Sequence, residues 1–91
     1  MADVVITLKV MLSSTDVDIS AVEKKITAKI SDFGGKLWKV EVEPIAFGLN
    51  ALKFMFLMDE SKGGTEKLED DIKNLDEVSS VNVDDVRRAV G

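Results

Sequence analysis

The sequence predicts an α+β fold in which a four-stranded antiparallel sheet carries two helices on one face. Strand-like and helix-like apolar patterns follow one another in the order β-α-β-β-α-β. The first and third strands are apolar on both faces, as central strands are. Because β-α-β crossovers are right-handed and connections are short, this order predicts a ferredoxin-like sandwich with strand order 4-1-3-2. We expect one domain over residues 1–91.

The first half of the chain supplies a central strand and an amphipathic helix. Residues 3–11 are rich in β-branched side chains, which predicts a strand. Asp16, Asp18 or Ser20 can cap the helix that follows, and residues 20–23 match a capping box. Gly34 and Gly35 end this helix. Its apolar positions recur every three or four residues: Ile19, Val22, Ile26, Ile30 and Phe33.

Residues 36–44 alternate between apolar and charged side chains, which is typical of a half-buried strand. The pattern points Trp38, Val40 and Val42 toward the core, so that Trp38 packs in the core or at its edge. The charges and the terminal Pro44, which has no N–H to donate, favour an edge position.

The second half contains two more strands and a second helix. Residues 49–58 form a strand with one fully apolar face: Leu52, Phe54, Phe56 and Met58. Thr65 is placed to cap a helix whose apolar stripe is Leu68, Ile72 and Leu75. A short last strand is expected over residues 78–86, with Val81 and Val83 inward, and residues 87–91 form a tail.

Composition and net charge limit the classes of function that the chain can have. The net charge of −5 argues against a nucleic-acid surface and suits a basic partner, although solubility explains it equally well. There are no cysteines and no histidines, so a thiolate metal site is excluded and acid–base catalysis is disfavoured. No apolar run is long enough to span a membrane, and the start of the chain lacks signal-peptide features. We expect a cytoplasmic protein without a cofactor.

Other candidate sites have ordinary structural explanations. The acidic pairs at residues 59–60, 70–71 and 84–85 are expected to be solvated charges rather than metal ligands. Residues 63–65 could hold a phosphate at a helix N-terminus, but no P-loop lysine follows them. We therefore expect a helix cap preceded by two conformationally flexible glycines. RNA-recognition domains share the topology, but here the first strand has no aromatic residue and Phe54 and Phe56 are expected in the core.

The segment between the second and third strands is the main functional candidate. Pro44 ends one strand, and Gly48 can adopt φ > 0, so the chain reverses in a hairpin whose corner carries Phe47. A hairpin corner does not require a large apolar side chain. Phe47 is therefore covered either by its own hairpin or by a partner, and the residues alone leave both possibilities open.

Residues 43–52, EPIAFGLNAL, resemble the archaeal elongation factor 1-beta family. Further similarity lies in residues 5–11, 16–18, 63–65 and 84–88, so the resemblance covers essentially the whole chain. It implies a ferredoxin-like fold and a guanine-nucleotide exchange function toward the GTPase elongation factor 1-alpha. The resemblance also implies a non-enzymatic role. We expect no direct nucleic-acid or membrane contact and a monomer when free.

The resemblance implies a set of partner-binding residues as well. Phe47 would enter a pocket of the GTPase beside its switch region, presented by Ile45, Ala46 and Gly48. Eukaryotic members end with a lysine that reaches the magnesium site, whereas this chain ends in Arg87, Arg88 and residues 89–91 without a lysine. Either Arg87 or Arg88 would have to replace the charge of that lysine, or this branch of the family works without a cation there. The alternative function is a small-molecule-sensing regulatory domain of the same topology.

Overall fold

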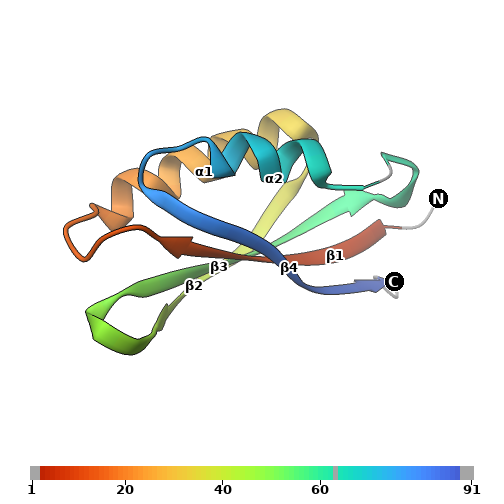
Figure 1. The fold of residues 1–91 in the computed structure, drawn as a ribbon. Coiled ribbons are helices and arrows are strands. Elements are labelled where there is room, and N and C mark those ends of the chain that lie inside the picture. The colour runs from red at the N-terminus through yellow and green to blue at the C-terminus, as the bar shows by residue number, and fades with distance from the viewer. Residues whose placement is uncertain (1–2, 63, 89–91) are drawn as a thin grey trace.

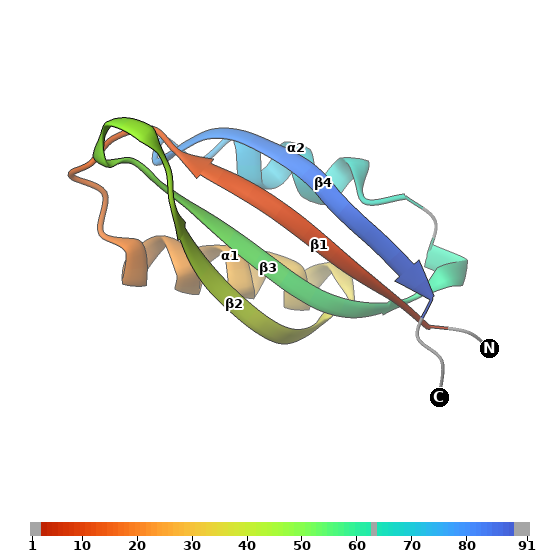
Figure 2. The same ribbon diagram turned by 90° about the horizontal axis from the view of Figure 1, so that it is seen from below.

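The computed structural model describes residues 3–62 and 64–88 and confirms the predicted ferredoxin-like α+β fold (Figures 1 and 2). One antiparallel sheet has the strand order β2-β3-β1-β4, and α1 and α2 cover one of its faces. The elements are β1 (Asp3–Leu12), α1 (Ile19–Phe33), β2 (Lys36–Pro44), η1 (Ala46–Gly48), β3 (Asn50–Asp59), η2 (Glu60–Lys62), α2 (Glu66–Lys73) and β4 (Val78–Arg88).

The core fills the space between the sheet and the two helices. Alternate residues of the central strands β1 and β3 point into it, which is the period-two pattern predicted from the sequence. Burial of each of these large side chains contributes about 1.5–3 kcal/mol. The strand residues are Ile6, Leu8, Val10, Leu12, Leu52, Phe54, Phe56 and Met58, and the helix residues are Val22, Ile26, Ile30, Leu68 and Ile72.

Both ends of α1 are fixed by hydrogen bonds. Of the three candidate caps, Asp18 is the one used: its Oδ1 accepts from the Ala21 N–H at 3.3 Å. At the other end Gly34 adopts φ 99°, and the Gly35 N–H donates to the Ile30 carbonyl at 2.9 Å. The helix therefore ends where the sequence predicted and begins after the second of the three candidate caps; Ser20 lies inside the helix, so the capping box expected over residues 20–23 is wrong.

Thr65 precedes α2 at the predicted position, but its side chain does not cap the helix backbone. Its hydroxyl instead donates to Glu69 Oε2 at 2.9 Å, while its carbonyl accepts from the Glu69 N–H at 2.8 Å. Thr65 is buried, so this bond supplies a partner for a hydroxyl that has little access to water.

The prediction that Trp38 packs in the core or at its edge is wrong. A bulge between Leu37 and Lys39 leaves Trp38 without a partner on β3, and its side chain is 66% exposed. Leu37 takes the inward position opposite Phe56. Val42 follows the predicted register opposite Leu52, yet it is exposed because it lies on the edge strand β2.

The last strand is longer than predicted. β4 continues to Arg88, so Arg87 and Arg88 belong to the sheet rather than to a tail, and they pair with Val5 and Val4. A second bulge at Asp84 separates the pairs Thr7–Asp85 and Leu8–Val83. Val83 lies opposite Leu8, as an inward residue would, but on this edge strand it remains 40% exposed.

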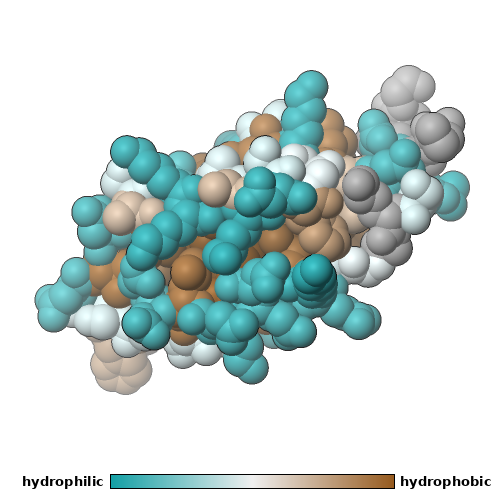
Figure 3. Space-filling view, turned by 90° about the horizontal axis from the view of Figure 1, so that it is seen from above, coloured by the Kyte–Doolittle hydropathy of each residue, from teal (hydrophilic) through white to brown (hydrophobic). Residues whose placement is uncertain are grey.

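Hydrophilic side chains cover most of the helix side of the molecule, with smaller areas of hydrophobic surface between them (Figure 3). Members of two acidic pairs make ion pairs: Asp84 with Lys53, Asp85 with Arg87 and Glu60 with Arg88. Among the described residues no group of acidic side chains converges closely enough to hold a metal ion. None of the described helices is long and apolar enough to cross a membrane.

Gly35 is a position where the packing tolerates no side chain. A Cβ atom there would lie 2.8 Å from Ile30 Cγ2 and 2.8 Å from Phe56 Cδ2. We expect Gly35→Ala to lower the free energy of unfolding by about 1–3 kcal/mol, because both neighbours are buried and must shift. Urea unfolding measures this cost. Gly64→Ala is the matched control, since its Cβ would meet nothing closer than 3.8 Å; equal stability of the two variants would contradict the packing described here.

Candidate functional site

The candidate site is the corner between β2 and β3, where the chain reverses within residues 45–49. Phe47 and Gly48 have φ values of 63° and 74°, both in the left-handed region. Two hydrogen bonds close the corner: the Ile45 N–H donates to the Leu49 carbonyl at 2.8 Å, and the Leu49 N–H donates to the Ala46 carbonyl at 3.4 Å. Phe47 is the only non-glycine residue with positive φ in the described part of the chain.

The side chain of Phe47 is 95% exposed. The possibility that its own hairpin covers the ring is therefore wrong. Ala46 and Gly48 beside it are also exposed, while Ile45 and Leu49 are half-buried at the base of the corner. A left-handed backbone costs an L-residue about 1–2 kcal/mol, and no burial of the ring offsets that cost. The corner thus holds a large apolar side chain in water on a strained backbone.

Ion pairs on the open face of the sheet brace the base of the hairpin. Glu43, near the end of β2, lies 3.2 Å from Lys53 Nζ on β3 and 3.9 Å from Lys9 Nζ on β1. Lys53 also lies 3.4 Å from Asp84 on β4. The Glu43 carboxylate, with Asp84 in second place, raises the pKa of Lys53. Lys9 and Lys53 oppose each other directly in the sheet, so these carboxylates also offset a like-charge repulsion.

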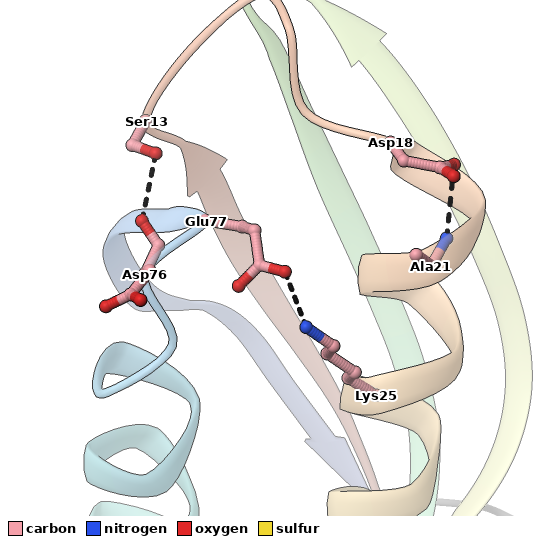
Figure 4. Close-up of polar contacts among 6 residues, drawn as sticks. All are labelled: Ser13, Asp18, Ala21, Lys25, Asp76 and Glu77. Carbon is pink, nitrogen blue, oxygen red and sulfur yellow. Dashed lines mark hydrogen bonds and ion pairs between the residues drawn. The ribbon is translucent and has the colours of Figure 1, made fainter.

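The loop between β1 and α1 lies against the other side of the corner. A Cβ atom at Gly48 would lie 3.6 Å from Thr15 Cγ2, which is ordinary van der Waals contact. Ser13 in turn ties this loop to the connection after α2: its hydroxyl donates to the Asp76 carbonyl at 3.1 Å (Figure 4). Its N–H donates to the Glu77 carbonyl at 2.9 Å. Three chain segments therefore meet at this end of the molecule.

Glu77 extends the same network to α1. Its Oε2 lies 2.6 Å from Lys25 Nζ (Figure 4), and this hydrogen bond lowers the pKa of the Glu77 carboxyl. The stabilisation is present above the pKa of Glu77 in the unfolded chain and is lost as the pH falls through its lower value in the folded protein. At neutral pH the α2–β4 connection is thus held to α1.

The structure separates the predicted site residues into two groups. Ile45, Ala46, Phe47 and Gly48 form the corner, whereas Arg87 and Arg88 lie near the far end of the sheet (Figure 2). Arg87 pairs with Val5, which pairs with Leu57, seven residues along β3 from the corner. At about 3.3 Å per residue, the seven residues from Asn50 to Leu57 alone separate the two groups by at least roughly 23 Å along the strand direction. Both arginines are mostly exposed and ion-paired, Arg87 to Asp85 at 2.7 Å and Arg88 to Glu60 at 3.5 Å.

Sequence reasoning found the aromatic corner but missed the residues that support it. The role of Thr15 and Ser13 depends on contacts between loops far apart in the chain, which no local pattern reports. The positive φ of Phe47 also had no local signal, because phenylalanine disfavours that region. Gly48 was the one residue of the corner whose type indicated its backbone conformation.

Solved structures with the same fold define the structural class. The chain is similar to the C-terminal domain of the MgtC protein from Mycobacterium tuberculosis, with a TM-score of 0.66 and 15% identity over 98% of this chain and 88% of that one. It is also similar to the ACT domain of GTP pyrophosphokinase from Chlorobium tepidum, with a TM-score of 0.62 and 17% identity over 89% and 97%. The molecule is thus a ferredoxin-like domain, and its hairpin carries an exposed aromatic residue.

Sequence comparisons identify the family within this class. The model of the EF-1 guanine nucleotide exchange domain matches residues 5–89, and the chain belongs to this family. Elongation factor 1-beta of Methanothermobacter thermautotrophicus is 47% identical over 97% of this chain and 98% of its own. Elongation factor 1-beta of Staphylothermus marinus is 38% identical over the same shares. These matches confirm the resemblance to archaeal elongation factor 1-beta.

The strain at Phe47 leads to a stability test. We expect Phe47→Asn to raise the free energy of unfolding by about 0.5–1 kcal/mol, because asparagine tolerates the left-handed region and the exposed ring contributes no burial. Phe47→Val is the control and should lower it, since β-branched residues tolerate this region worst. Thermal or urea unfolding gives both values, and the reverse order would contradict a strained corner.

Proposed function

We propose that this chain promotes the replacement of GDP by GTP on elongation factor 1-alpha, and that the Phe47 corner is its main contact with that GTPase. Membership of the EF-1 guanine nucleotide exchange domain family supports the proposed function. The exposed and strained Phe47 supports the choice of the corner as the contact site. The protein would act in the cytoplasm, as a monomer when free and without a cofactor or direct nucleic-acid contact.

The mechanism needs no covalent chemistry. An exchange factor binds the nucleotide-free GTPase more tightly than the GDP form, and by reciprocity its binding weakens GDP binding by the same factor. The chain itself is then a ligand rather than an enzyme. Carboxylates and cations of this chain would orient the complex, while the chemical step on GTP belongs to the partner.

The corner has the properties of an interface anchor. Aromatic side chains that enter a partner's pocket dominate binding energy, and their truncation often costs more than about 2 kcal/mol. The Ile45–Leu49 and Leu49–Ala46 hydrogen bonds hold the backbone in one conformation, so little conformational freedom is lost on docking. Ile45, Ala46 and Gly48 would present the ring without enclosing it.

Arg87 and Arg88 are proposed as a second contact. Because they lie at least roughly 23 Å from the corner, contact with both groups requires a partner that extends along the long axis of the molecule, which measures 42 Å. Their ion pairs with Asp85 and Glu60 are mostly exposed, and exposed pairs contribute only about 0–1 kcal/mol, so both guanidinium groups can be released to a partner. Residues 89–91, where eukaryotic members carry their lysine, lie outside the described residues.

The small-molecule-sensing alternative has support only from topology. The similarity to the ACT domain lies at 17% identity and concerns the fold, whereas the elongation factor relatives match along nearly the full chain. Exchange is therefore the better-supported function.

The decisive experiment measures release of a fluorescent GDP analogue from the cognate elongation factor 1-alpha. The wild-type chain should accelerate release, and Phe47→Ala should reduce the acceleration at least tenfold at subsaturating concentration, as expected for loss of an anchor of about 1.4 kcal/mol or more. Circular dichroism would show that the variant remains folded.

Trp38→Ala is the matched control, because Trp38 is also an exposed aromatic residue on the same hairpin but lies well away from the corner. It should leave the acceleration unchanged. An equal loss in both variants would show that exposed aromatic surface in general, not the corner, drives binding. Absence of acceleration by the wild type would overturn the exchange function.

A further inference from the structure

We propose that Arg87, rather than Arg88, is the cation that this chain presents to the GTPase, and that the GTPase lies on the open face of the sheet between Arg87 and the Phe47 corner. This inference rests on the proposed exchange function and narrows its second contact to one residue and one face. The group that fits Arg87 is an acidic side chain of the GTPase, because the planar guanidinium group binds a carboxylate through two hydrogen bonds.

The bulge at Asp84 places the two arginines on opposite faces of the sheet. Residues that lie directly opposite each other on neighbouring strands share a face. Val83 before the bulge and Val86 after it both lie opposite core residues of β1, so the inward positions of β4 change from odd to even numbers. Arg88 therefore lies on the helix side and Arg87 on the open face. An unbroken strand would reverse this arrangement and turn Arg87 inward.

Arg88 is tied to another segment on the helix side. It lies opposite Val4, which packs against the core, and its Nη2 is 3.5 Å from Glu60 Oε1 in η2. Val4 and Glu60 also line one cavity of about 220 Å³, together with Thr65 at the start of α2. The Arg88–Glu60 ion pair thus links β4 to the connection that leads into α2. Releasing Arg88 to a partner would break a contact between two separate segments.

Arg87, by contrast, makes its ion pair with a residue of its own strand. Its Nε lies 2.7 Å from Asp85 Oδ2, and the two residues are neighbours on one face of β4, opposite Val5 and Thr7. Breaking this ion pair detaches no segment of the fold from another. The Arg87 side chain is also 79% exposed, so it can exchange Asp85 for a carboxylate of the GTPase at little cost.

An apolar strip lies beside Arg87 on the open face. Val5, which lies opposite Arg87, has Leu57 on its other side, and Met55 follows two residues away on the same face of β3. All three apolar side chains are half-buried. Figure 2 looks onto this face, with both helices behind the sheet, so that no helix covers the strip. Methionine and arginine are enriched in protein interfaces, and an apolar strip bordered by an arginine has that composition.

The size of a stable interface favours the open face. Such an interface buries about 800 Å² on each partner, whereas one aromatic side chain supplies at most about 250 Å². An exchange complex of ordinary size therefore extends from the Phe47 corner over an adjoining face. On the helix side α1 and α2 stand on the sheet (Figure 1), whereas the open face runs from the corner to Arg87 without an intervening helix (Figure 2).

The first test compares Arg87→Gln with Arg88→Gln in the GDP-release assay at subsaturating concentration and over a range of salt concentrations. Glutamine removes the charge and keeps a long polar side chain, and circular dichroism checks that both variants fold. We expect Arg87→Gln to reduce the acceleration about fivefold or more and to weaken its salt dependence, because an interface charge is lost. Arg88→Gln should reduce it less than about twofold, since an exposed charge outside the interface contributes little.

Lys24→Gln is the matched control, because it removes one exposed positive charge from α1 on the helix side. It should leave the acceleration unchanged. An equal or larger loss in Arg88→Gln, an equal loss in Lys24→Gln, or no loss in Arg87→Gln would each overturn the assignment of Arg87. In all three cases acceleration by the wild type would leave the exchange function standing.

The second test addresses the face. The chain contains no cysteine, so a single introduced cysteine can be labelled with a bulky maleimide reagent. Asn82 is exposed on the open face opposite Lys9, and Lys67 is exposed on α2. Labelled Asn82→Cys should lose the acceleration, and labelled Lys67→Cys should keep it. Full activity of labelled Asn82→Cys, or loss in both variants, would overturn the open face. Failure of the wild type to accelerate release would remove the exchange function and this inference with it.

Discussion

The candidate site depends on a backbone constraint at the turn between β2 and β3. Phe47 and Gly48 both occupy the left-handed region, and the hydrogen bonds between Ile45 and Leu49 and between Leu49 and Ala46 close the loop around them. This conformation is unfavourable for phenylalanine, and the exposed ring contributes nothing to the core that would offset the cost. Strain of this kind persists where the surrounding structure enforces it, and it occurs preferentially at functional sites.

The rest of the fold supplies the support that the corner needs. β1 and β3 form a rigid central pair whose inward side chains pack under both helices, and Glu43 ties the edge strand β2 to both through Lys53 and Lys9. The loop after β1 passes close to Gly48, with a Cβ position there 3.6 Å from Thr15 Cγ2, and Ser13 ties this loop to the connection after α2. The ferredoxin-like domain thus presents one exposed aromatic side chain at one end of a long, narrow molecule.

Sequence patterns predicted the fold nearly completely because the signals were local and redundant. The alternation in β3 and the three-to-four spacing in α1 each follow from one face being buried, and the structure places Phe54 and Ile26 as expected. The errors in the strands lie on the edge strands: bulges at Trp38 and Asp84 break the period-two pattern, and a bulge depends on the neighbouring strand rather than on local sequence. Phe47 was found as a candidate, but its full exposure and its support by Thr15 are tertiary facts.

The most direct test of this account is an NMR cross-saturation experiment on the deuterated, nitrogen-15-labelled chain bound to unlabelled, nucleotide-free elongation factor 1-alpha. Saturation transferred from the GTPase reports which amides lie at the interface. The account predicts the strongest attenuation at the amides of residues 45–49, with further attenuation in the loop of residues 13–18. Attenuation confined to the open face of the sheet, for example at Met55 and Leu57, with the corner unaffected, would contradict it.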